Sequence, residues 1–336
     1  MLENLGRHFL QKLAAETAHD LSIKLLASPF ARIASHKIHQ NPVELFGVKF
    51  PNPVGLAAGF DKNADAINGL AKLGFGFVEV GTVTPKPQIG NPKPRLFRLP
   101  NNQAIINRMG FNNKGVNHLI SQLKKYPQEI PVGINIGKNK ITPNDKAVDD
   151  YIYCLRKAHL LADYITINIS SPNTLDLRQL QESENLVNLL QNLKQEQLEL
   201  EKKSKKYTPI VVKIAPDQGD EATKSMAQTI KISQIDGIIC TNTTINKNNL
   251  KKELHQNETG GLSGKPLLSR SNAVLKLIRQ TLGDDFPLIG VGGILTEDDA
   301  MSKIAAGANL VQIYTGFIYQ GTQLIKGINH KIQSTA

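Results

Sequence analysis

The chain has 336 residues, of which 40% are hydrophobic and 21% are charged, and this composition suits a soluble globular protein. Its 40 Lys and Arg residues exceed the 29 Asp and Glu residues by 11, which favours a partner with negative charge: a phosphorylated cofactor, an acidic substrate, nucleic acid or an anionic membrane. The two cysteines, Cys154 and Cys240, exclude a disulfide framework and a zinc site. No stretch reaches the roughly 20 apolar residues of a membrane-spanning helix. Gln11 and Lys12 interrupt the only apolar run near the N-terminus, so we expect no signal peptide and a protein kept in the cytoplasm.

Residues 1 to about 40 predict an amphipathic helical segment ahead of the first core strand. Apolar residues recur at helical spacing from Leu2 to Leu13 and again from Leu21 to Ala27, with Ala14–Asp20 and its His19 between the two stretches. Such a pair of helices can plug the bottom of a barrel, lie on a membrane or form a vestibule for an apolar ligand. The pattern alone favours the plug.

From Val43 onward, strands and helices alternate. Eight mostly β-branched segments predict core strands: Val54–Gly59, Gly76–Gly81, Val132–Gly137, Tyr164–Ser170, Ile210–Ala215, Gly237–Thr241, Leu288–Gly292 and Leu310–Tyr314. Amphipathic stretches between them predict helices, for example Ala64–Leu73, Val148–Leu161, Glu184–Lys203 and Glu297–Ala306. This alternation predicts an α/β fold of the (β/α)8 TIM-barrel type. A doubly wound sheet would more often use fewer strands, and no convincing GxGxxG motif opens a first helix.

Two connections are longer than a barrel requires. Thr82–Asn113 is rich in proline and arginine, and Thr243–Leu268 is rich in lysine and ends in a glycine-rich segment. Long loops in a compact domain tend to be functional. Both follow the C-terminal end of a strand, so we expect both to lie over the same mouth of the barrel.

The stretch Ile165–Thr174 marks that mouth. Its first half alternates apolar and polar residues, which predicts a strand, and Pro172 ends the strand because proline cannot continue the hydrogen-bond ladder. Asn168 and Ser171 therefore stand at a strand end, where a (β/α)8 barrel carries its chemistry. Asn and Ser also make ordinary turns and helix caps, so this stretch alone leaves both interpretations open.

Further strand ends predict a site for a phosphorylated cofactor. Lys62 and Lys213 stand near strand ends, and a buried lysine must be paired or meet an anion. The backbone amides of Gly264, Gly293 and Thr315 could cradle a phosphate, because bare N–H groups can approach its oxygens. These features favour flavin mononucleotide (FMN) over PLP, which needs a Schiff-base lysine.

The chain closely resembles the dihydroorotate dehydrogenases, specifically their membrane-associated, quinone-using class 2. The resemblance covers nearly the whole chain and rests on these motifs in order: Gly55–Asn63, Glu79–Pro85, Pro94–Leu99, Asn107–Asn113, Asn135–Asn139, Asn168–Thr174, Val212–Asp217, Thr241–Thr244, Gly260–Gly264 and Gly290–Ile294. It implies oxidation of dihydroorotate to orotate in de novo pyrimidine synthesis, with FMN as cofactor and a membrane quinone as electron acceptor.

The same resemblance implies roles for individual residues. Ser171 matches the catalytic base, and Thr174 and Phe111 are candidates for holding a proton-relay water. The residues matched to the substrate are Lys62, Asn107, Arg108, Met109, Gly110, Phe111, Asn168, Asn173, Asn242 and Thr243. The residues matched to FMN are Ala58, Gly59, Lys62, Thr82, Asn135, Asn168, Lys213, Thr241, Gly264, Gly293, Tyr314 and Thr315. The residues matched to the quinone head group are His19, Arg98 and Tyr314, and no metal ligand is expected.

Class 2 is indicated by Ser171, because class 1 enzymes carry cysteine there, and by the N-terminal extension, which class 2 uses for quinone entry. With this resemblance, residues 1–40 change from a barrel plug to a membrane-touching helical extension, and residues 41–336 form the FMN-binding barrel. We expect a monomer bound peripherally to the cytoplasmic side of the inner membrane. One departure is Asp176, where the family commonly has glycine; we expect altered loop kinetics rather than lost activity.

Two rival functions remain at this stage. A flavin barrel that acts on RNA, such as a tRNA-dihydrouridine synthase, fits the net charge of +11 but needs a cysteine acid in the active site. A non-catalytic membrane-bound barrel would be expected to have lost the polar residues of the mouth, which are all present. We therefore expect no nucleic acid partner.

Overall fold

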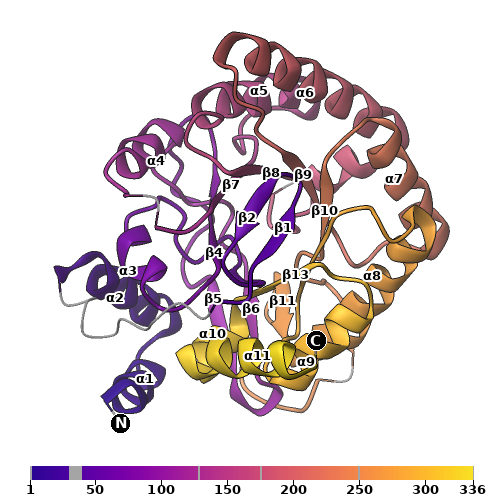
Figure 1. Cartoon of the computed structure of the whole chain (residues 1–336). Coiled ribbons are helices and arrows are strands. Elements are labelled where there is room, and N and C mark those ends of the chain that lie inside the picture. The colour runs from indigo at the N-terminus through magenta and orange to yellow at the C-terminus, as the bar shows by residue number, and fades with distance from the viewer. Residues whose placement is uncertain (1, 30–39, 128, 175, 249, 336) are drawn as a thin grey trace.

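The computed structural model describes residues 2–29, 40–127, 129–174, 176–248 and 250–335 (Figure 1). Eight parallel strands close into a barrel, and their order around it is β3 (Val54–Leu56), β4 (Phe77–Val83), β7 (Val132–Ile136), β8 (Tyr164–Asn168), β9 (Ile210–Ile214), β10 (Gly237–Cys240), β12 (Leu288–Val291) and β13 (Leu310–Ile313). The predicted (β/α)8 barrel is confirmed. Seven of the eight strands stop before their predicted last residue, and only β4 runs past its predicted end.

A ring of helices surrounds the barrel (Figure 1). In chain order these are α3 (Ile67–Ala71), α4 (Val116–Leu123), α5 (Ala147–Ala158), α6 (Ser183–Ser204), α7 (Asp220–Ile232), α8 (Leu268–Leu282), α9 (Glu297–Ala305), α10 (Thr315–Gln320) and α11 (Thr322–Thr335). Short 3₁₀ turns span Pro100–Asn102, Asn144–Lys146, Leu177–Gln181 and Lys265–Leu267. Each long helix turns an apolar stripe to the strands; in α5, for example, Tyr151, Cys154 and Leu155 are buried.

A β-hairpin closes the N-terminal end of the barrel. Strands β1 (Val43–Leu45) and β2 (Val48–Phe50) pair antiparallel and lie across the barrel centre in Figure 1. Phe50 packs against Phe77, with ring centroids 5.0 Å apart, and Phe46 packs against Tyr164 at 5.7 Å. The plug is therefore this hairpin and not the helical residues 2–27, so the first interpretation of the N-terminal segment was wrong.

The two long connections join in a second sheet. Strands β5 (Leu96–Leu99) and β6 (Ala104–Asn107) come from the first connection, and β11 (Gly261–Gly264) comes from the second. They pair antiparallel in the order β11-β6-β5, and Gly261 lies opposite Asn107. Leu99, Ile106 and Leu262 form a small core of their own here. Both connections meet at the mouth as expected, but as an ordered sheet rather than as loops.

Helices α1 (Leu2–Lys12) and α2 (Ala15–Ala27) precede the barrel. Because α2 begins at Ala15, His19 lies on a helix, and the predicted segment Ala14–Asp20 between the helices is wrong. Ile23 of α2 packs on the barrel core, whereas Phe9 of α1 is 58% exposed. Within the described parts of the chain, no helix is both long enough and apolar enough to cross a membrane. Residues 30–39 of the predicted extension lie outside the described residues.

Candidate active site and adjoining apolar cavity

A cavity opens at the C-terminal ends of the barrel strands, with about 1020 Å³ of space not filled by protein atoms. We call it the mouth cavity. The predicted substrate and cofactor residues that line it are Ala58, Gly59, Lys62, Thr82, Asn107, Met109, Gly110, Phe111, Asn168, Ser171, Asn173, Lys213, Thr241, Asn242, Thr243, Gly264, Gly293, Tyr314 and Thr315. The fold thus brings together residues that are up to 257 positions apart (315 − 58) in the sequence.

Arg108 is not brought to the mouth cavity. Its guanidinium forms an ion pair with Glu258, with Nη1 2.7 Å from Oε2, and lies 4.6 Å from the ring centre of Phe97. Nη2 donates to the carbonyl oxygen of Pro94 at 2.9 Å. The predicted contact between this side chain and substrate therefore has no support in the structure, and Arg108 instead ties the second sheet to its neighbouring loops.

Asn135 and Thr174 lie just outside the cavity wall. Asn135 is fully buried, accepts from Thr82 Oγ1 at 2.5 Å and donates to Glu79 at 2.8 Å. Asn135 therefore positions Thr82, and Thr82 in turn lines the mouth cavity. The Thr174 hydroxyl is buried, and no partner for it exists among the described residues. A buried hydroxyl without a partner is a place where a bound water would compensate.

Asparagine side chains form the polar wall of the mouth cavity. Asn168 donates to Thr82 Oγ1 at 2.8 Å and accepts from Asn242 at 3.3 Å. Asn173 donates to Asn107 Oδ1 at 3.1 Å. Each asparagine amide has both a donor and an acceptor, so the group can bind a planar ligand that carries both.

Ser171 stands three residues beyond the end of β8. It is 6% exposed, lines the mouth cavity, and its Oγ accepts from the backbone N–H of Asn173 at 3.3 Å. That bond leaves the hydroxyl proton free to be donated elsewhere. We expected Pro172 to end the strand, whereas β8 already ends at Asn168 and Ser171 lies between that end and Pro172.

Arg178 braces this rim, and the sequence analysis missed it. Its guanidinium donates to the carbonyl oxygens of Ser170 and Thr243, both at 3.1 Å, and pairs with Asp217 at 2.9 Å. One side chain thereby ties together the ends of β8, β9 and β10. An arginine fork suits this task because its donors have fixed geometry. Nothing in the spacing between Ser171 and Arg178 predicts this bracing role.

The two predicted lysines are cations in confined surroundings. Burial and, to a lesser extent, the charge of Arg95 lower the pKa of Lys62 to about 7. Its Nζ donates to Asn112 Oδ1. Burial also lowers the pKa of Lys213, while the charge of Glu79 opposes that shift. Both ammonium groups gain if an anionic or electron-rich ligand enters the cavity.

The glycines of the predicted phosphate cradle are required by close packing. A Cβ on Gly293, which has φ +86°, would lie 2.3 Å from Leu268 Cα at the start of α8. A Cβ on Gly264, which has φ +94°, would lie 2.3 Å from the carbonyl oxygen of Gln103. Both positions therefore present bare backbone to the cavity, and such a cradle fits the phosphate of a nucleotide cofactor.

Gln312 and Ser263 also line the mouth cavity, and the sequence analysis missed both. The Oε1 of Gln312 is buried without a hydrogen-bond partner among the described residues, while its Nε2 donates to Glu79 at 2.7 Å. Ser263 Oγ lies 2.8 Å from Thr315 Oγ1. Gln312 is the polar residue of the otherwise apolar strand β13, and this pattern could have indicated a role for it in the site.

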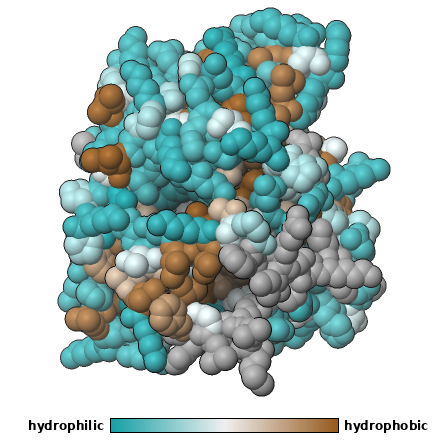
Figure 2. Space-filling view, turned by 90° about the vertical axis from the view of Figure 1, so that its left-hand side faces the viewer, coloured by the Kyte–Doolittle hydropathy of each residue, from teal (hydrophilic) through white to brown (hydrophobic). Residues whose placement is uncertain are grey.

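A second, mostly apolar cavity lies between α1, α2 and the barrel, with about 1280 Å³ of space not filled by protein atoms. We call it the helix cavity. His19, Arg98 and Tyr314, the three residues predicted for a quinone, all line it. Figure 2 shows the side of the molecule on which α1 and α2 lie, with a hydrophobic area beside a hollow. Tyr314 lines both cavities, so it forms part of the wall between them.

Aromatic rings connect the helix cavity to that wall. His19 packs on Phe60 with ring centroids 5.3 Å apart, and Phe60 packs on Tyr314 at 5.9 Å. Burial and the charge of Lys62 lower the pKa of His19 to about 4, so this imidazole is neutral at pH 7. A neutral imidazole and aromatic rings form a suitable surface for an uncharged ring ligand.

Arg98 connects the N-terminal helices to the second sheet. Its guanidinium donates to the carbonyl oxygens of Leu10 at 3.2 Å and Gln11 at 2.8 Å, and also to that of Leu13. These carbonyls lie at and just beyond the C-terminal end of α1, where a cation is stabilised by the helix dipole. Glu16 of α2 adds an ion pair to Arg95 at 2.7 Å.

Asp176, the residue that departs from the family's usual glycine, has a left-handed backbone conformation. Its φ is +53°, a region that glycine enters without cost and aspartate tolerates better than most residues. We expect Asp176→Gly to loosen the loop after Ser171, raising amide hydrogen exchange there, and to change turnover by less than about tenfold. Lys205→Gly, at φ +61° at the end of α6, is the matched control and should change neither. Unchanged exchange together with unchanged turnover in Asp176→Gly would count against this idea.

A family model described as dihydroorotate dehydrogenase matches residues 41–335. The chain belongs to the dihydroorotate dehydrogenase family. A protein named dihydroorotate dehydrogenase (quinone) from Saccharophagus degradans is 53% identical over 95% of both chains. One of the same name from Dechloromonas aromatica is 50% identical and covers 98% of this chain and 96% of its own.

Solved structures agree. The crystal structure of DHODH from Eimeria tenella in complex with ferulenol superposes with a TM-score of 0.90 at 38% identity, covering 95% of this chain and 91% of that chain. The ligand-free form of the same protein superposes with a TM-score of 0.89 at 39% identity, and the match covers 95% of this chain and 94% of that chain. The dihydroorotate dehydrogenase resemblance and the barrel with its N-terminal helices are confirmed.

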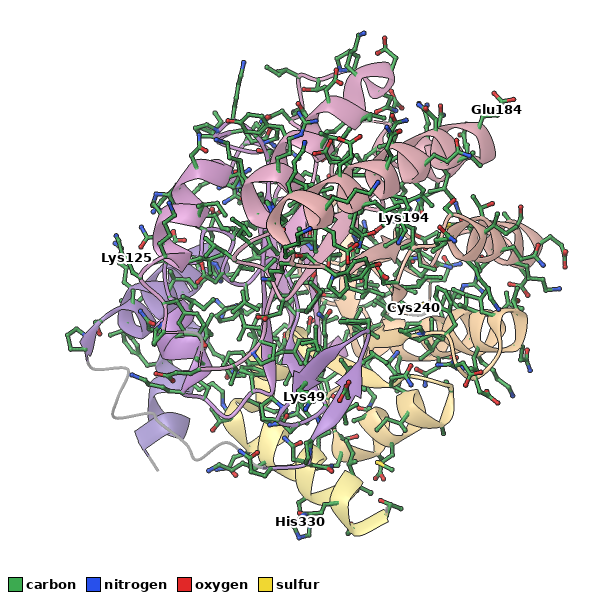
Figure 3. All side chains as sticks on the ribbon, turned by 45° about the horizontal axis from the view of Figure 1, so that its top comes forward. Lys49, Lys125, Glu184, Lys194, Cys240 and His330 are labelled. Carbon is green, nitrogen blue, oxygen red and sulfur yellow. The ribbon has the colours of Figure 1, made fainter. Side chains whose placement is uncertain are left out.

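Neither cysteine of this chain is placed to act as the acid that an RNA-acting flavin enzyme needs. Cys154 and Cys240 are buried free thiols, and neither lines the mouth cavity. Burial raises the pKa of Cys240 to about 12. In Figure 3, Cys240 lies inside the ring of helices, whereas Glu184 and Lys125 lie at the periphery. The RNA-acting alternative therefore lacks its catalytic group.

Proposed function

We propose that this chain oxidises dihydroorotate to orotate in pyrimidine synthesis and transfers the electrons to a quinone. The observation that carries the proposal is the pair of cavities that share Tyr314. One is lined by asparagines, two lysines and Ser171, and the other is mostly apolar and lies under the N-terminal helices. Membership of the family and relatives named for quinone use support the same assignment.

FMN is the cofactor that we propose for the mouth cavity. The glycine backbones at Gly264 and Gly293 suit its phosphate. Lys213, Thr82 and Gln312 Oε1, which has no partner among the described residues, suit the polar edge of a flavin ring. The remaining residues proposed to hold it are Ala58, Gly59, Lys62, Asn135, Asn168, Thr241, Tyr314 and Thr315. When bound, FMN supplies a hydride acceptor next to the substrate and a route for electrons to the quinone.

The asparagine wall orients the substrate. Asn107, Asn168, Asn173 and Asn242, together with Thr243, offer paired donors and acceptors for the ring amides of dihydroorotate, and Met109, Gly110 and Phe111 line the same cavity. Lys62 binds the carboxylate through a charge-assisted hydrogen bond.

Ser171 removes the C5 proton of the substrate. A serine is a weak base unaided, so its hydroxyl proton must pass on as the new bond forms. The buried, unpartnered hydroxyl of Thr174 and the ring of Phe111 suit a water that accepts it. Arg178 ties the carbonyl oxygen of Ser170, the residue before Ser171, to that of Thr243 beyond β10.

The helix cavity receives the quinone. Its apolar wall suits a prenylated ring, and His19, Arg98 and Tyr314 supply its polar edge. Exposed apolar side chains on the same helices, such as Phe9 and Leu25, suit a membrane surface from which the quinone enters. We further propose a monomer bound peripherally to the cytoplasmic side of the inner membrane, with residues 1–40 as its contact and residues 41–336 as the catalytic barrel.

The proposal is tested by incubating purified protein with dihydroorotate and a short-chain quinone and measuring orotate by its absorbance. We expect yellow protein that releases FMN on denaturation and forms orotate in equal amount to the quinone consumed. Colourless protein, or orotate formed without quinone consumption, would contradict the proposal. RNA binding with a steep salt dependence would favour the RNA-acting alternative.

Blocking the helix cavity should impair only the quinone reaction. Ala18 of α2 lines this cavity, so Ala18→Trp should raise the KM for quinone about tenfold or more by filling it, and leave reduction by dihydroorotate unchanged. Ala27→Trp, on the same helix but exposed and outside the cavity wall, is the matched control. An equal effect of both substitutions would contradict the proposed quinone site.

A further inference from the structure

Lys303 is a buried lysine on α9 with no part in the proposed mechanism. Its side chain is 0% exposed. Its stem crosses β12 at Gly290, where an added Cβ would lie 2.4 Å from Lys303 Cγ. Only a glycine therefore leaves room for the lysine at this point. Burial lowers the pKa of Lys303 to about 7, because removal from water disfavours the ammonium.

The ammonium of Lys303 reaches the back of the glycine loop that lines the mouth cavity. Its Nζ donates to Ser271 Oγ at 2.6 Å. The same hydroxyl lies 3.0 Å from the carbonyl oxygens of both Leu268 and Gly292, and it can donate to either. Gly292 and Gly293 line the mouth cavity, so two hydrogen bonds separate a buried cation from the wall of the phosphate cradle.

Within the described part of the chain, Lys303 forms no ion pair. The two groups whose charges raise its pKa are Cys240 and Asp299. Burial keeps Cys240 a neutral thiol, with its pKa raised to about 12. The Asp299 carboxylate accepts the N–H groups of Leu295 and Thr296, both at 2.9 Å, as part of the cap of α9. A buried cation without a paired anion is costly, so an anion supplied by a ligand would compensate for it.

We propose that Lys303 is the buried counter-charge for the cofactor phosphate, acting through Ser271 and the Gly292–Gly293 loop. This inference rests on the proposed function, because the phosphate is that of FMN. The cradle itself offers backbone amides, and Gly293 packs on the first turn of α8, whose dipole favours an anion. Lys303 in its protonated form adds a positive charge behind that loop. It is a positioning residue and does not touch substrate.

The test compares FMN with riboflavin, which lacks the phosphate, by titrating each into full-length apoprotein and following the quenching of flavin fluorescence. Lys303→Gln keeps a hydrogen-bond donor for Ser271 but removes the charge. We expect it to weaken FMN binding about tenfold or more and to leave riboflavin binding unchanged. Ser271→Ala should shift the preference in the same direction.

Lys206→Met is the matched control, since Lys206 donates to the carbonyl oxygens of Leu160 and Ala162 ahead of β8, away from the mouth. It should leave both affinities unchanged. If Lys303→Gln weakens FMN and riboflavin equally, or weakens neither, Lys303 only braces the fold and the inference is overturned. If the unaltered protein binds neither flavin, the proposed function itself fails, and that result is distinct from a failure of Lys303.

Discussion

Ser171→Ala should slow the reduction of the bound flavin by dihydroorotate by about 10²- to 10⁴-fold, the range expected for loss of a general base. Ser171 lies just beyond the end of β8 and lines the mouth cavity. Reoxidation by quinone should be unchanged, because the helix cavity is lined by other residues. Stopped-flow absorbance under anaerobic conditions measures the two steps separately.

A serine far from the mouth provides the control for this substitution. Ser121 on α4 is exposed, and its Oγ donates to the carbonyl oxygen of His118 in its own helix. Ser121→Ala should leave both steps unchanged. Reduction that is as fast in Ser171→Ala as in the unaltered protein would remove Ser171 as the base, even with the family assignment intact.

Lys62→Met should weaken binding of orotate and dihydroorotate about 10- to 100-fold, the range for losing a charge-assisted hydrogen bond. Lys62 lines the mouth cavity and is the cation proposed for the substrate carboxylate. Lys114→Met is the matched control, because Lys114 is a partly exposed lysine paired with Asp65 at 2.7 Å. Equal affinity in Lys62→Met and the unaltered protein would exclude this carboxylate contact.

The lowered pKa of Lys62, about 7, adds a pH dependence. Below that pH the free protein holds an ammonium, and above it the neutral amine prevails. A carboxylate prefers the ammonium, so the dissociation constant of orotate should rise with pH above about 7. In Lys62→Met this rise should disappear, and titration of orotate binding at several pH values measures it. Persistence of the rise in the variant would assign it to another group.

The barrel could be predicted because most core strands are β-branched runs, and most of the predicted segments end in a polar residue or a glycine. The hairpin β1–β2 could not, because its strands have three residues each and its turn holds Phe46 at φ +40° instead of a recognisable turn pair. The second sheet was hidden for a related reason. Its strands come from connections 161 residues apart (243 − 82), and local patterns carry no information on such pairing.

The sequence allowed us to predict which strand-end residues meet at the mouth cavity, because parallel barrel strands bring their C-terminal ends together. Arg108 shows the limit of this reasoning, since its neighbours line the cavity while its own side chain pairs with Glu258. The direction of a side chain depends on partners that spacing does not reveal. Lys303 stands on a helix among polar residues and reads as surface, and only the gap at Gly290 explains its burial.

Anaerobic mixing with dihydroorotate and then with a quinone analogue tests most directly whether the two cavities divide the reaction between them. In the unaltered protein, flavin absorbance should bleach with substrate and recover with quinone. Ser171→Ala should slow only the bleaching, and Ala18→Trp should slow only the recovery. If both substitutions slow the same step, or if the flavin stays oxidised with dihydroorotate in the unaltered protein, the two-cavity account is contradicted.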